Sequence, residues 1–107
     1  MTAIDRAAAQ RMMEEGVATF VEVLDAPCFE KSHLPGAINV PLSDRFGQRI
    51  REAAPDKHAP VVVYCQDERC DASPKAAREL EKLGYTRVYD YAAGKADWKG
   101  AGLPVEP

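Results

Sequence analysis

The chain has 107 residues, of which 46% are hydrophobic and 29% are charged, and its formal net charge is −3 at pH 7. This length and composition predict a single globular domain over residues 1–107 and exclude disordered and fibrous classes. The acidic balance argues against nucleic acid or an anionic membrane as the main partner, and no apolar run approaches the roughly 20 residues of a membrane helix. Because no signal peptide is visible and the cysteines number three, we expect a cytoplasmic protein with at least one free thiol.

Hydrophobic spacing and turn residues predict the elements of the first half of the chain. In order, these are a helix over about 3–15, a strand over 20–24, a helical turn over 27–31, a short strand over 37–40 and a helix ended by Pro55. We expect Thr2 to cap the first helix and Gly16 to stop it. Ser43 is expected to cap the helix that Pro55 ends.

An unbroken apolar run at residues 61–64 is typical of a central parallel strand that is covered on both faces. Residues 65–73 show no periodicity, and Ser73 followed by Pro74 predicts a helix start with serine as the N-cap. A last strand near 87–89 and a short helix complete the chain. Strands that alternate with helices predict an α/β fold in which a parallel sheet carries helices on both faces. Such folds bind ligands beyond the carboxyl ends of their strands.

Cys65 directly follows the strand expected at 61–64 and begins the loop that leads to the next helix. The loop amides and the first helical amides lack intrahelical partners, so they can surround an anion. Positive potential at such a place lowers the pKa of a thiol and favours a nucleophilic cysteine. The competing interpretation is that Cys65 is a small core residue, as most free cysteines are.

Three segments, in this order, resemble signatures of the rhodanese family. Residues 22–41 read EVLDAPCFEKSHLPGAINVP, residues 61–65 read VVVYC, and residues 84–105 contain GYTRVY, AGKADW and AGLPV. They resemble the family's opening signature, its strand into the catalytic cysteine and its closing segment. The resemblance implies one rhodanese-like domain with a parallel sheet of about five strands flanked by helices on both faces.

The resemblance also implies a reaction, because active members carry sulfane sulfur on a cysteine as a persulfide. Only Cys65 matches that cysteine, and no cofactor is implied. The partners would be a small sulfur donor or a protein persulfide, and a thiol acceptor. The anionic part of the donor would be held by the amides of the loop, which comprises Gln66, Asp67, Glu68, Arg69, Cys70, Asp71, Ala72 and Ser73.

The chain departs from the family pattern in four places. The loop is longer than usual, and it carries Asp67, Glu68 and Asp71 against a single arginine. This charge repels dianions and opposes a low thiol pKa, so we expect a persulfide donor to be favoured over thiosulfate. Leu24 stands where the family has a strand-end arginine, which removes a common ion pair. The usual Gly-Gly pair is Ala-Gly at 93–94.

Cys70 lies five positions after Cys65 on the same loop. Tight curvature could bring the two thiols within disulfide reach, which requires Cα atoms closer than about 7 Å. One hypothesis is therefore that Cys70 resolves a persulfide or sulfenic acid on Cys65. The alternative is that Cys70 packs at the start of the helix that follows.

The remaining candidates are interpreted as structural. They are Cys28 as packing, His33 as a turn-orienting residue, His58 as solvated, Trp98 as a helix anchor, and Arg45, Arg49 and Arg51 as a solvated face or a docking face for an acidic protein. The Cys-x4-Cys spacing is a weak zinc signal, so no metal is expected.

The sequence therefore predicts a sulfurtransferase in which Cys65 is the nucleophile and persulfide carrier. A different class stays open: a binding or regulatory module that keeps the fold without efficient turnover, or a Cys65–Cys70 redox switch. Phosphate or arsenate chemistry is a third reading. The acidic loop and its single arginine argue against it, since no second guanidinium clamps equatorial oxygens.

Overall fold

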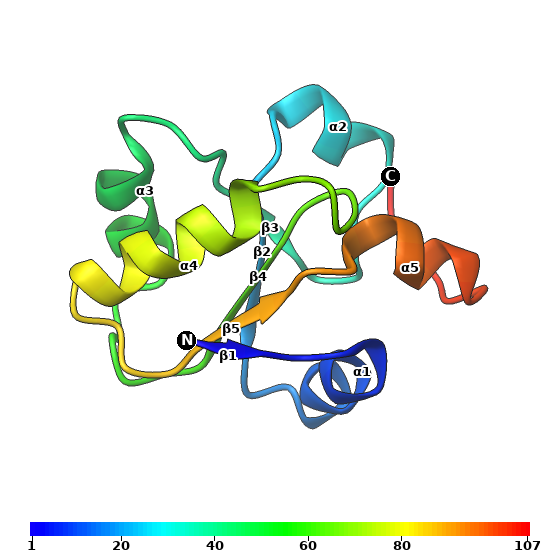
Figure 1. The fold of residues 1–107 in the computed structure, drawn as a ribbon, viewed down its shortest axis with the longest axis horizontal. Helices are drawn as coiled ribbons and strands as arrows, with labels where there is room; N and C mark the ends of the chain where they lie inside the picture. Colours follow the sequence, from blue (N-terminus) through cyan, green and yellow to red (C-terminus); the bar gives the residue numbers. More distant parts are fainter.

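A five-stranded parallel sheet forms the centre of the molecule in the computed structural model, which describes residues 1–107 (Figure 1). The strands are β1 Thr2–Ala3, β2 Thr19–Glu22, β3 Ile38–Asn39, β4 Val61–Tyr64 and β5 Val88–Tyr91. Their order across the sheet is β1-β5-β4-β2-β3. All pairs are parallel, which confirms the predicted α/β fold.

Helices cover both faces of the sheet, as Figure 1 shows. They are α1 Arg6–Glu15, α2 Ala26–Lys31, α3 Phe46–Ala53, α4 Ala72–Lys82 and α5 Gly94–Gly100. Side chains from α3 and α4 share one apolar cluster with the sheet, and side chains from α1 and α5 share another. None of the five helices has the length and apolar composition needed to cross a lipid bilayer.

The central strand β4 is buried along its whole length, because both of its faces meet a helix layer. Its side chains alternate between the two faces, as in any strand. Val61, Val63 and Cys65 join the cluster under α3 and α4, while Val62 and Tyr64 join the cluster under α1 and α5. The alternation therefore directs the Cys65 side chain toward α4 and the Tyr64 side chain toward α5.

The first segment of the chain differs from the prediction. Residues Thr2–Ala3 form β1 at the sheet edge instead of the start of a helix, and the amide of Ile4 donates to the carbonyl of Asp90. Asp5 is the actual N-cap of α1, and its carboxylate accepts a hydrogen bond from the amide of Ala8 at 2.9 Å. The backbone groups of residues 2–4 therefore form hydrogen bonds with β5, and they are not available for an additional helical turn before α1.

The predicted serine caps are also wrong. Helix α4 begins at Ala72 with Asp71 as its N-cap, so Ser73 lies inside the first turn and is fully buried. Pro74 still fits, because the amides of a first turn have no intrahelical partner to lose. Ser43 precedes α3 and instead accepts a hydrogen bond from the amide of Arg45 at 3.2 Å.

Candidate active site

Cys65 lies directly after β4 with its side chain under the first turn of α4, where it is fully buried. Its thiol donates to the carbonyl of Cys70 at 3.6 Å and to the carbonyl of Asp67 at a longer 4.0 Å. Two carbonyl oxygens of the loop thus face the sulfur. Carbonyl oxygens favour the protonated thiol over the thiolate.

The main influence on the pKa of Cys65 is burial, rather than the loop amides and loop carboxylates that the sequence sets against each other. Burial, followed by the nearby side chain of Cys70, raises the pKa of Cys65 to about 11. The hydroxyl and amide of Ser73 lower that pKa, but by less than burial raises it. In this closed arrangement the site holds a neutral thiol, and only Ser73 contributes the donors that the expected cradle of amides would supply.

The loop between β4 and α4 runs over residues 65–71, because Ala72 and Ser73 belong to the helix. Its acidic charge is smaller than the sequence suggests. Asp67 accepts a hydrogen bond from the amide of Arg69 at 3.0 Å and lies 3.5 Å from its guanidinium. Asp71 pairs with Lys75 at 2.9 Å, and this pair lowers the pKa of Asp71. Of the three loop carboxylates, Glu68 alone makes no ion pair.

The base of the loop is fixed to the start of α5. The amide of Lys95 donates to the carbonyl of Cys65 at 2.9 Å, and the amide of Ala96 donates to the carbonyl of Gln66 at 2.8 Å. Gly94 permits this approach, because it has a φ of +66° and a Cβ there would collide with the carbonyl of Cys65. Ala93, with a φ of −64°, needs no glycine, so the Ala-Gly departure is harmless.

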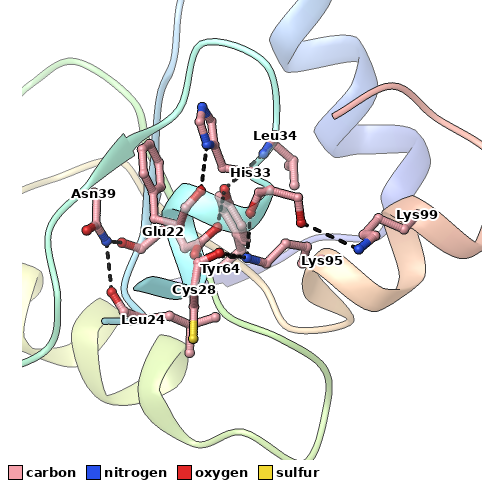
Figure 2. Close-up of polar contacts among 11 residues, drawn as sticks. Glu22, Leu24, Cys28, His33, Leu34, Asn39, Tyr64, Lys95 and Lys99 are labelled. Atoms are coloured by element: carbon pink, nitrogen blue, oxygen red, sulfur yellow. Dashed lines mark hydrogen bonds and ion pairs between the residues drawn. The ribbon is translucent and has the colours of Figure 1, made fainter. Parts of the chain in front are cut away.

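A buried ion pair joins α5 to β2 on the face opposite the thiol (Figure 2). The ammonium of Lys95 contacts a carboxylate oxygen of Glu22 at 3.0 Å and donates to the carbonyls of Ser32 at 2.6 Å and Cys28 at 3.0 Å. All three of its donors are therefore used. The hydroxyl of Tyr64 donates to the other Glu22 oxygen at 3.0 Å and accepts from the amide of Leu34 at 3.1 Å.

Sequence reasoning missed this network. It noted the loss of the strand-end arginine at Leu24 but found no replacement. The signal was present in two places: Glu22 interrupts an apolar strand run, and Lys95 immediately follows the glycine of the closing motif. Burial and the nearby Glu22 carboxylate raise the pKa of Tyr64, so this phenol stays protonated as a hydrogen-bond donor.

Two buried polar groups lie on the thiol side of the sheet. Ser73 and Asp90 are almost fully covered, and each has a side-chain oxygen without a hydrogen-bond partner. Burial raises the pKa of Asp90, with an opposing effect from nearby Ser73. The Ser73 hydroxyl is thus close to both Cys65 and Asp90 without forming a full hydrogen bond to either.

The other sequence candidates lie outside this site. The His33 ring stacks on Phe29 with centroids 3.8 Å apart and bonds the Phe29 carbonyl, which suits the predicted turn-orienting role. The indole of Trp98 donates to the carbonyl of Pro104 at 2.8 Å and anchors the tail. The exposed candidates are Cys28, His58, Arg45, Arg49 and Arg51. No group of three or more His, Cys, Asp or Glu side chains could hold a metal ion.

Known proteins are similar to this chain in sequence and in fold. The family model of the rhodanese-like domain matches residues 5–101. The chain belongs to the rhodanese-like family. The thiosulfate sulfurtransferase GlpE of Vibrio cholerae is 33% identical over 103 residues, which is 96% of this chain and 92% of that protein.

Other proteins similar to this chain differ in length and in name. The HTH-type transcriptional regulator Rv0324 of Mycobacterium tuberculosis is 35% identical over 104 residues, which is 97% of this chain but 44% of the regulator. The chain thus spans less than half the length of that relative. A solved structure described as a rhodanese with anions from Escherichia coli has a TM-score of 0.68 and 34% identity, covering 83% of this chain and 96% of its own.

Proposed function

We propose that this chain is a sulfurtransferase that moves a sulfane sulfur from a donor to a thiophilic acceptor through a persulfide on Cys65. The observation that carries the proposal is the place of Cys65, directly after the buried central strand β4 and under the first turn of α4. The similarity to GlpE, a thiosulfate sulfurtransferase, over 96% of the chain supports it. Three unpaired cysteines suit the reducing cytoplasm.

The reaction has two displacement steps. The Cys65 thiolate attacks the outer sulfur of a donor persulfide, the donor's S–S bond breaks, and the donor leaves as a thiolate. An acceptor thiolate then attacks the outer sulfur of the Cys65 persulfide and regenerates the Cys65 thiolate. Because a thiolate is needed, the carbonyls of Cys70 and Asp67 must turn away from the sulfur when the donor binds.

The charge of the loop favours a donor that carries at most one negative charge near the sulfur. Asp67 and Asp71 are paired with cations, but Glu68 is not. An unpaired carboxylate on the loop repels a dianion such as thiosulfate more than a persulfide monoanion. We therefore propose a low-molecular-weight or protein persulfide as the preferred donor and a thiol as the acceptor.

Intact-mass measurement tests this function most directly. The Cys70→Ser protein, which has no second thiol beside Cys65, is incubated without oxygen with glutathione persulfide or with thiosulfate. We expect the protein to gain one sulfur atom, which cyanide then removes. The fraction of protein that gains it should be larger with glutathione persulfide than with thiosulfate. The matched Cys65→Ser/Cys70→Ser protein should gain none. No gain from either donor would contradict the proposal.

The second candidate function is a binding or regulatory module without efficient turnover. The observation that favours it is the fully buried Cys65 with a pKa raised to about 11, since such a thiol is a poor nucleophile at neutral pH. The related regulator Rv0324 bears a name of that class. Failure to load sulfur on Cys65, with a folded protein, would select this candidate.

A further inference from the structure

We propose that Cys70 is a built-in acceptor for the sulfur on Cys65: its thiolate attacks the persulfide, forms a Cys65–Cys70 disulfide and releases hydrosulfide. The inference rests on the proposed persulfide on Cys65. It adds a second reacting residue and a different product, because the sulfur leaves as sulfide instead of passing to an external thiol.

The fold of the loop brings the two cysteines together. The amide of Cys70 donates to the carbonyl of Asp67 at 3.1 Å, and this turn folds residue 70 back over the end of β4. The Cys65 sulfur lies 3.6 Å from the carbonyl oxygen of Cys70. Since that oxygen is two bonds from its Cα, the Cα of Cys70 lies within about 6 Å of the Cys65 sulfur.

The side chains point the same way. Cys70 packs against the apolar cluster that contains Cys65, on the α4 side of the sheet. The nearby Cys70 side chain also raises the pKa of Cys65, which agrees with this packing. To form a disulfide from this starting point, the loop has to bring the two neighbouring sulfur atoms to bonding distance.

Burial of Cys65 favours an acceptor from inside the protein. Cys65 is fully covered, whereas Cys70 is half-buried and contacts it already. An external thiol must first displace the loop to reach a sulfur on Cys65. The Cys70 thiol needs no such access, so once the persulfide has formed and the loop has closed, it is the nearest nucleophile.

The chemistry balances without an outside oxidant. Cys70 loses its proton to solvent and its sulfur bonds to the Cys65 sulfur, while the S–S bond of the persulfide breaks and the terminal sulfur leaves as hydrosulfide. The sulfane sulfur is reduced, and the two cysteines are oxidised to a disulfide. Two equivalents of a low-molecular-weight thiol, or one dithiol, then attack at the more exposed Cys70 sulfur and restore both thiols.

The test follows the sulfur and the cysteines separately. Reduced wild-type protein receives one equivalent of glutathione persulfide without oxygen, and released hydrosulfide is measured beside the intact mass under non-reducing conditions. We expect about one equivalent of hydrosulfide, a mass lower by two hydrogen atoms, and a linked peptide containing residues 65 and 70. The Cys70→Ser protein should keep its added sulfur and release at least ten times less hydrosulfide in the same period.

Cys28→Ser is the matched control, because Cys28 is exposed on α2 and does not belong to the cluster that contains Cys65 and Cys70. It should behave as the wild type does. Wild-type protein that holds its added sulfur without forming the 65–70 link would overturn the inference and leave the sulfurtransferase standing. If the Cys70→Ser protein gains no sulfur and the wild type forms no 65–70 link, the proposed function itself is wrong. Equal hydrosulfide release from Cys70→Ser would assign the step to another nucleophile.

Discussion

Lys95 is bonded to Cys65 and to Glu22 through two different parts of the same residue. Its backbone amide holds the carbonyl of Cys65 at 2.9 Å, and its side-chain ammonium reaches Glu22 at 3.0 Å on the other face of the sheet. The backbone of the candidate nucleophile is therefore tied to a buried charge network that the sulfur itself never touches. A defect in that network should shift both stability and the position of the loop.

Replacing Lys95 by methionine should be strongly destabilising. The change leaves the Glu22 carboxylate buried without its cation, which costs about 3–5 kcal/mol of unfolding free energy. Urea denaturation measures the loss. Adding Glu22→Gln to Lys95→Met should recover part of it, because the remaining side chain is uncharged. The exposed pair of Lys82 and Glu79 is the control, and Lys82→Ala should cost less than about 1 kcal/mol.

Gly94→Ala should disturb the site more than the same change at Gly102. Both glycines have positive φ, +66° and +75°, so each substitution carries about 1–2 kcal/mol of backbone strain. Only at Gly94 does the added Cβ meet the carbonyl of Cys65 and the backbone of Gln66. We expect a further loss of about 1–3 kcal/mol from this overlap, measured as the difference in unfolding free energy between the variants. Equal losses would show that the close approach is unimportant.

The raised pKa of Cys65 predicts slow alkylation at neutral pH. A shift from 9.0 to about 11 lowers the thiolate fraction at pH 7 about 100-fold. Since the thiolate is the reactive form, iodoacetamide should modify Cys65 at least 100-fold more slowly than free cysteine, and the rate should rise up to about pH 11. Peptide mapping separates Cys65 from the other thiols. A rate at pH 7 equal to that of free cysteine would mean an open loop with an exposed thiol of ordinary pKa.

Ser73→Ala should separate stability from sulfur loading. The Ser73 hydroxyl is buried without a hydrogen-bond partner, so its removal should change the unfolding free energy by less than about 1 kcal/mol. The same hydroxyl lowers the pKa of Cys65, so its loss should slow persulfide formation and move the pH profile of loading upward. A profile that does not move would show that the hydroxyl has no influence on the thiol.

The sequence predicts those elements whose position depends mainly on a local pattern of residues. Strand β4 was predicted at its observed bounds, because a strand covered on both faces needs an unbroken apolar run. The two-residue strand β1 was missed, since its pairing with β5 joins Thr2 to Tyr89 and leaves no pattern in so short a segment. The start of α4 was placed two residues late, because Pro74 fits several positions in a first turn.

The candidate site shows the same division. Motif and strand position located Cys65 and its loop. The orientation of the carbonyls toward the sulfur depends on a turn within that loop, and the ion pair of Lys95 with Glu22 joins residues 73 apart. Neither relation leaves a short-range pattern. The pKa of Cys65 could not be predicted for this reason, since burial and carbonyl contact are properties of the assembled fold.

The bonds from the amides of Lys95 and Ala96 to the carbonyls of Cys65 and Gln66 divide the loop into a fixed base and a free span. Opening for a donor then hinges after Gln66, and the thiol stays on the rigid side of that hinge. Amide hydrogens of Lys95 and Ala96 would exchange with solvent as slowly as those of β4, whereas those of residues 67–70 would exchange early. During turnover, residues 67–70 would move away from the sulfur, while Cys65 itself stays fixed at the end of β4.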